Sequence, residues 1–122
     1  MVQALAIRER ITNWVDVCHL SAIKPNTGVC ALVENQQIAI FRVGKDADLY
    51  AISNYDPFSK TFVLSRGIIG DRNGIPKVAS PIYKQNFNLI TGQCFDDETV
   101  SVPTYLARVV NDRVQVAISD LS

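Results

Sequence analysis

The sequence feature that most constrains the fold is a series of short runs rich in β-branched and aromatic residues, separated by turn residues. The two clearest runs, 105–110 and 113–118, alternate apolar and polar residues on either side of Asn111 and Asp112. Such alternation predicts half-buried strands, and a two-residue connection of turn formers predicts a tight hairpin between them. No segment keeps a 3.6-residue apolar period over three turns, so we expect little helix.

A second hairpin is predicted upstream, where the strand-like runs 28–33 and 37–43 flank the polar residues 34–36. One short helical turn is expected at 20–23, ending before Pro25. The remaining predicted strands are the runs 14–18, 49–53, 76–79, 87–89 and 93–95. Many short strands with turn signals between them are typical of an all-β protein, here an antiparallel sandwich or barrel.

The regular pattern fails over residues 54–74, which we expect to form a long ordered loop. Loops of more than about 12 residues inside a compact domain are usually functional or disordered. This one carries too many large apolar side chains for a disordered segment, namely Tyr55, Phe58, Phe62, Ile68 and Ile69. Together with the shorter loop 80–86, it is predicted to form the tip of a single domain that spans residues 1–122.

Composition argues against two classes of partner. Twelve Lys and Arg residues balance twelve Asp and Glu residues, so no net field attracts nucleic acid. No apolar run approaches the roughly 18 residues of a membrane span, and residues 1–10 do not resemble a secretory signal. The three cysteines, at wide spacing, form no disulfide framework. We therefore expect a cytoplasmic protein with reduced thiols that binds neither nucleic acid nor a membrane.

Two short motifs share the frame of an iron–sulfur ligand loop: Asn-Tyr-Asp at 54–56 and Ser-Pro-Ile-Tyr at 80–83. Two loops of the form C-x-H and C-x-x-H each supply one Cys and one His to a Rieske two-iron, two-sulfur centre. The surrounding sequence resembles the Rieske domain family, including the turn at Thr91 and Gly92 that follows the second motif. The resemblance implies a Rieske-like fold with two loops of the ligand type.

The four ligand positions of that frame carry Asn54, Asp56, Ser80 and Tyr83, none of which offers a thiolate or an imidazole. The single histidine of the chain, His19, cannot supply the two imidazoles of a Rieske centre. One carboxylate among the four side chains is also too little charge for a calcium or magnesium site. We therefore expect no metal here, and predict that these groups hydrogen-bond with one another and fix the two loops.

Six longer stretches carry a closer resemblance: WVDVCHL (14–20), GVCALV (28–33), NYDPF (54–58), VLSRGIIGD (63–71), VASPIYKQNF (78–87) and TGQCFDDETVSVP (91–103). Over nearly its whole length the chain resembles the small subunit of cytoplasmic NAD(P)H-dependent nitrite reductase. The resemblance implies a non-catalytic, accessory role in an assimilatory enzyme that reduces nitrite to ammonia. It also implies that FAD, sirohaem and an iron–sulfur cluster belong to the large subunit, the expected partner, and that this chain binds no cofactor.

The tip also carries a candidate partner-binding surface. Aromatic and Arg side chains with polar surroundings are typical of protein–protein hot spots. Bases stack on aromatic side chains when single-stranded nucleic acid binds, but the neutral charge of the chain disfavours this alternative. We predict that the large subunit docks on Tyr55, Phe58, Lys60, Arg66, Ile82, Tyr83 and Lys84.

The residues themselves indicate no catalysis by this chain. Cys18 and His19 are neighbours in a predicted strand, so their side chains point to opposite faces. Gly67, Gly70 and Gly74 do not match a G-x-G-x-x-G phosphate loop. Two alternatives remain open: a free-standing Rieske-like binding or regulatory domain, and an electron-transfer module with an unconventional metal site.

Overall fold

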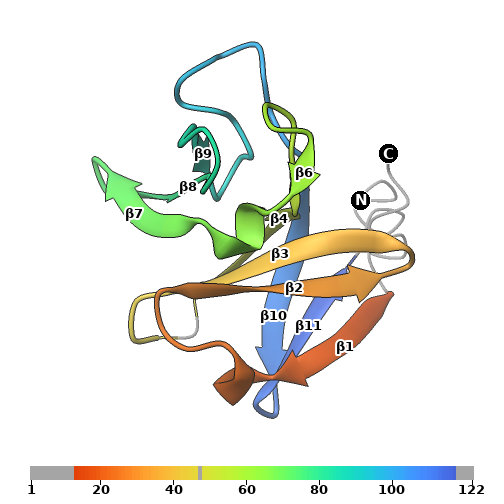
Figure 1. Ribbon diagram of the computed structural model, residues 1–122. Helices are drawn as coiled ribbons and strands as arrows, with labels where there is room; N and C mark the ends of the chain where they lie inside the picture. The colour runs from red at the N-terminus through yellow and green to blue at the C-terminus, as the bar shows by residue number, and fades with distance from the viewer. Residues whose placement is uncertain (1–12, 47, 118–122) are drawn as a thin grey trace, which may run out of the picture.

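The computed structural model describes residues 13–46 and 48–117, which form a curled antiparallel sheet and a smaller β layer above it (Figure 1). The six strands of the sheet are β1 (Trp14–His19), β2 (Thr27–Val33), β3 (Gln36–Val43), β4 (Asp48–Ser53), β10 (Thr104–Val110) and β11 (Arg113–Ala117). Their order is β1-β11-β10-β4-β3-β2. The prediction of an all-β antiparallel fold is confirmed.

The smaller layer is built from the chain between β4 and β10. Its strands are β5 (Tyr55–Asp56) and β6 (Thr61–Phe62) in one sheet, and β7 (Ile68–Arg72), β8 (Ile75–Ala79) and β9 (Asn86–Asn88) in another. The helical segments among the described residues are two 3-10 turns, η1 (Leu20–Ala22) and η2 (Leu64–Arg66). Neither turn approaches the length and apolar character of a membrane-spanning helix.

Strand β3 is buried on both faces, because one face lies inside the curled sheet and the other lies under the smaller layer. Ile38, Ile40 and Val114 belong to the cluster inside the sheet. Phe41 and Phe87 belong to the cluster beneath the smaller layer. All five side chains are completely buried. Burial of both faces explains why residues 38–41 form a continuous apolar run without strict alternation.

Two tight hairpins form where the sequence predicts them. Asn111 and Asp112 connect β10 to β11 with φ angles of 51° and 61°. Glu34 and Asn35 connect β2 to β3 with φ angles of 49° and 67°. Positive φ at both central residues is the type I′ geometry, whose twist matches the twist of the flanking strands.

The prediction that residues 54–74 form a loop is wrong for the second half of this segment. Ile68–Arg72 forms β7, which pairs with β8 over five positions on either side of Asn73 and Gly74. Most side chains of β7 are exposed, so the strand is held by backbone pairing and shows no alternating apolar face. The first half contains β5, β6 and η2 joined by short turns.

The strand predicted at 93–95 is also wrong. Gln93 and Cys94 make only isolated bridges, to Ser101 and Phe87. The side-chain amide of Gln93 donates to three backbone carbonyls of the adjoining loop at 2.9–3.3 Å, which fixes this segment without a sheet. Residues 1–10 and residue 118, the predicted end of the last strand, lie outside the described residues.

Candidate functional site

The two ligand-type loops lie side by side, and a hydrogen bond between buried side chains joins them. The first loop leaves β4 at Asn54, and the second leaves β8 at Ser80. The hydroxyl of Ser80 donates to Oδ2 of Asp56 at 2.5 Å. Asn54, Asp56 and Ser80 are 2%, 0% and 1% exposed. Three of the four ligand positions are therefore buried polar groups that depend on hydrogen-bond partners inside the protein.

Asp56 is the centre of this network. Besides Ser80, its carboxylate accepts hydrogen bonds from the Phe58 amide at 2.9 Å, the Ser59 hydroxyl at 2.9 Å and the Ser59 amide at 3.4 Å. Burial by itself raises the pKa of Asp56, but the donors, led by the Ser80 hydroxyl, hold this pKa below its ordinary value. The carboxylate is therefore an internal anion that ties the first loop to the second.

Asn54 joins the first loop to the rest of the fold. Its Oδ1 accepts from the amide of Ser65, the middle residue of η2, at 2.7 Å. Its Nδ2 donates to Oε1 of Gln37 at 3.2 Å and to Sγ of Cys30 at 3.4 Å, on β3 and β2. Both ends of the side-chain amide are thus satisfied by the protein, and neither is left for a ligand.

Each loop forms a turn of the same kind, with a lysine at its end. The Lys60 amide donates to the Asp56 carbonyl at 2.7 Å, and the Lys84 amide donates to the Ser80 carbonyl at 3.1 Å. Both lysines have positive φ, 59° and 65°, a conformation that costs a residue with a side chain about 1 kcal/mol. The two loops therefore share one geometry, and each presents a lysine at the tip.

The donor set does not fit a two-iron, two-sulfur cluster. Iron in such clusters needs thiolate or imidazole donors, whereas Asn54, Asp56 and Ser80 offer amide and oxygen atoms that already hold hydrogen bonds. Tyr83, at the fourth position, is 62% exposed. Over residues 13–46 and 48–117, no group of three or more His, Cys, Asp or Glu residues is arranged to hold a metal ion.

Most of the predicted docking residues are exposed: Lys60, Arg66, Ile82, Tyr83 and Lys84, whereas Tyr55 is half-buried. Together with Tyr55 and Phe62, we call these residues, which all lie in the chain between β4 and β10, the loop tip. Phe58 differs, because it packs against the core cluster and its ring lies 6.1 Å from that of Phe87. Phe62 was not among the predicted docking residues, yet it is 52% exposed and its ring lies 5.0 Å from that of Tyr55. Its position in a short polar-apolar strand gave no sequence signal of exposure.

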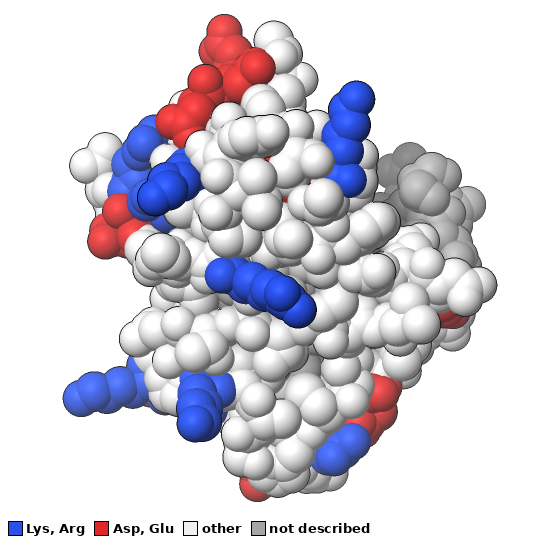
Figure 2. Space-filling view, viewed as in Figure 1, with Lys and Arg blue, Asp and Glu red and all other residues white. Residues whose placement is uncertain are grey.

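Basic side chains are spread over the face seen in Figure 2, and one of them lies across its middle, whereas acidic side chains gather mainly at one end. An acidic group covers the loop that follows β9, where residues 96–98 are Asp, Asp and Glu. Asp96 has a structural role, because its Oδ2 accepts from the amide of Asn86 at 2.7 Å and from Nδ2 of Asn86 at 3.1 Å. The acidic loop is therefore fixed to β9.

Comparison with known proteins places the chain in a family. The Rieske-like [2Fe-2S] domain family matches residues 13–117. The nitrite reductase (NADH) small subunit of Escherichia coli (strain K12) is 47% identical over 106 residues, which are 87% of this chain and 98% of that protein. The solution structure of the NAD(P)H nitrite reductase small subunit from Erwinia carotovora is 49% identical, with a TM-score of 0.77, and the match covers 92% of this chain and 86% of that one.

One relative is much longer. The NAD(P)H nitrite reductase large subunit of Klebsiella oxytoca is 39% identical over 108 residues, which are 88% of this chain but only 11% of that protein. The same domain therefore also occurs inside a large-subunit polypeptide. These matches confirm the resemblance found in the sequence motifs. The chain belongs to the Rieske-like [2Fe-2S] domain family and, within it, to the small subunits of NAD(P)H-dependent nitrite reductase.

Proposed function

We propose that the chain is the non-catalytic small subunit of an assimilatory NAD(P)H-dependent nitrite reductase and docks on its large subunit through the loop tip. The reduction of nitrite to ammonia takes place on the large subunit, which carries FAD, sirohaem and an iron–sulfur cluster. The complex works in the cytoplasm. The unpaired state of Cys18, Cys30 and Cys94 supports that location, because thiols persist in reducing compartments.

The observation that carries the proposal is that the chain keeps the two ligand-type loops of a Rieske domain, while the buried residues at the ligand positions form hydrogen bonds inside the protein and hold the loops in place. Asp56 and Ser80 are buried and bonded to each other, so the loops keep their shape without a cluster. A chain with this donor set has no cluster through which to pass electrons. The two loops still provide an exposed surface of fixed shape, which favours docking of a partner protein. The same observation disfavours the alternative of an electron-transfer module.

The loop tip has the composition of a protein-binding surface. Phe62, Ile82 and Tyr83 are exposed by 52%, 47% and 62%, and aromatic side chains of this kind are frequent interface anchors. Lys84 and Arg66 are exposed cations of the loop tip. Because the carboxylate of Asp56 points inward to Ser80 and Ser59, it does not neutralise these cations at the surface. We therefore expect an acidic patch with apolar pockets on the large subunit.

Charge reversal at the tip tests this docking surface. We expect the double variant Arg66→Glu, Lys84→Glu to bind the large subunit at least about 10-fold more weakly, because two favourable charge contacts become repulsive. The measurement is the dissociation constant for the purified cognate large subunit at low and at physiological salt. The difference between the variant and the wild type should shrink as salt rises.

The matched control is Lys24→Glu, Lys45→Glu. It makes the same change in net charge at exposed positions in the turns after η1 and after β3. We expect it to bind like the wild-type chain. If both double variants bind as tightly as the wild type, the large subunit docks on another surface.

A further inference from the structure

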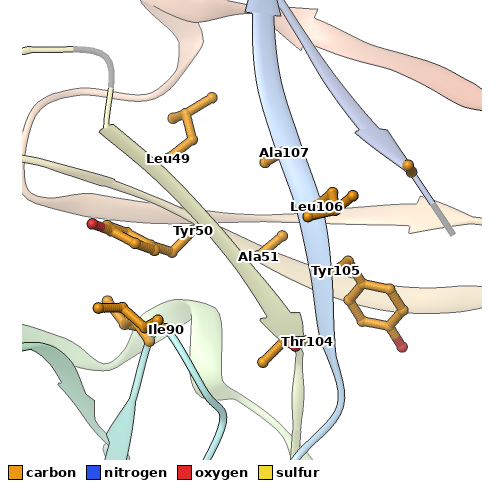
Figure 3. Close-up of a pocket in the computed structure, with 10 residues that line it drawn as sticks. Leu49, Tyr50, Ala51, Ile90, Thr104, Tyr105, Leu106 and Ala107 are labelled. Carbon is orange, nitrogen blue, oxygen red and sulfur yellow. The ribbon is translucent and has the colours of Figure 1, made fainter. Parts of the chain in front are cut away.

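A groove of about 450 Å³ opens between β4 and β10, on a part of the surface that the loop tip does not include. The two strands pair at only two positions, Thr104 with Ile52 and Tyr105 with Ala51. Beyond Ala51 they diverge, because β4 stays paired with β3 while β10 stays paired with β11. Figure 3 shows the resulting opening, with side chains of both strands around it.

The groove is lined by apolar and uncharged side chains. Leu49 and Tyr50 line it from β4, and Leu106 and Ala107 line it from β10 (Figure 3). Ile90 lines it from the smaller layer, where the Asn88 side chain accepts from the Ile90 amide at 2.8 Å and fixes the turn. Leu106 and Ile90 are 51% and 55% exposed. Two half-exposed aliphatic side chains therefore lie beside one groove, and contiguous apolar surface of this kind is what an interaction site buries.

The position of the groove indicates which protein covers it. Ala117, at the end of β11, lines the groove and is paired with both Leu106 and Trp14. The first and last strands of the domain thus bring their ends together at the groove. In the Klebsiella oxytoca relative the matched region is only 11% of a large-subunit polypeptide, so the rest of that polypeptide is connected to the domain through at least one of these ends. The groove therefore lies next to the point where the rest of that polypeptide joins the domain.

We infer that the groove between β4 and β10 is a second docking surface for the large subunit, in which apolar side chains of that subunit are buried. This inference rests on the proposed function, since it concerns the same partner. In a two-subunit enzyme the same contact forms between separate chains, because the fold that brings the ends to the groove is the same. The absence of charged residues among the groove's lining side chains makes this contact insensitive to salt, unlike the basic tip.

The test is the dissociation constant for the cognate large subunit, measured for the wild-type chain and for Leu106→Asp and Ile90→Asp. We expect each substitution to weaken binding about 30-fold, because it places a charge in the centre of an apolar contact. The control is Val110→Asp, on the same strand and on the same face as Leu106, 37% exposed and outside the groove. It should bind like the wild type. Circular dichroism checks the fold of each variant, and Ile90→Asp serves if Leu106→Asp does not fold.

Three results would count against the inference. If folded Leu106→Asp and Ile90→Asp bind as tightly as the wild type, the groove is not an interface with the large subunit. If they instead change the oligomeric state of the isolated chain and leave large-subunit binding intact, the groove joins two copies of this chain. If the wild-type chain itself does not bind the large subunit, the proposed function fails and this inference fails with it. The first two results leave the proposed function standing.

Discussion

Replacing Asp56 by alanine is expected to lower the free energy of unfolding by about 3 kcal/mol. The substitution removes the acceptor of four hydrogen bonds and leaves the buried Ser80 hydroxyl and the Phe58 amide without their partner. A buried donor that loses its acceptor keeps its full desolvation cost, about 1 to 3 kcal/mol for each such group. Because Asp56 joins the two loops, we also expect the loop tip to lose its fixed geometry.

Urea denaturation followed by circular dichroism measures this effect. The control is Asp48→Ala, an exposed aspartate at the start of β4, for which we expect a change of less than about 0.5 kcal/mol. If Asp56→Ala and Asp48→Ala unfold at the same urea concentration, the hydrogen-bond network is not what fixes the loops.

The pH dependence of stability provides a second test of the same carboxylate. The pKa of Asp56 in the folded protein lies below its ordinary value of 3.8, so folding favours the ionised form. Its contribution is therefore fully present above the unfolded pKa and is lost as the pH falls through the lower folded value. We expect the stability difference between wild type and Asp56→Asn to shrink below about pH 4. The pKa values of Asp16 and Asp97 are also lowered. Both residues are present in both proteins, so their contributions to the pH dependence cancel in the stability difference.

Replacing Gly67 by alanine is expected to destabilise the fold by about 3 kcal/mol. Gly67 follows η2 with φ −72°, so its backbone conformation suits any residue and the reason for glycine is space. A β-carbon there would lie 2.3 Å from the Ala79 carbonyl oxygen and 2.6 Å from Cγ2 of Val78. Ala79 directly precedes Ser80, so this close approach sets the distance between the two loops. Alanine would push them apart.

Gly70→Ala is the matched control for this substitution. Gly70 lies three residues further along the chain, in β7, and the nearest atom to an added β-carbon is Cε of Lys77 at 3.5 Å. We expect the free energy of unfolding to change by less than about 1 kcal/mol, since alanine also lowers the conformational entropy of the unfolded chain. Equal denaturation midpoints for the two variants would show that the contact between Gly67 and Ala79 does not constrain the tip.

The parts of the fold that were predictable from the sequence are those held by local signals. The hairpin of β10 and β11 combines alternation over both strands with turn formers at Asn111 and Asp112. Strand β7 lacks such a signal, because four of its five residues are exposed. Backbone hydrogen bonds to its pairing partner, β8, hold β7 in the extended conformation. Such pairing cannot be recognised from the sequence of β7 alone.

The site was predictable in outline and not in its contacts. The spacing of Asn54, Asp56 and Ser80 was enough to recognise the frame and the missing donors. Their hydrogen-bond partners come from segments distant in sequence, such as Gln37 and Ser65 for Asn54, and no local pattern specifies them. Phe58 shows the same limit, because only the structure distinguishes an aromatic residue that packs on the core from one that is exposed at the tip.

The most direct test of the central claim is NADH-dependent nitrite reduction by the cognate large subunit, expressed with and without this chain, together with co-purification of the two. A non-catalytic small subunit predicts that the chains co-purify, that activity appears or rises only when both are present, and that the chain alone reduces no nitrite. Full activity of the large subunit alone, with no complex between the chains, would contradict the account.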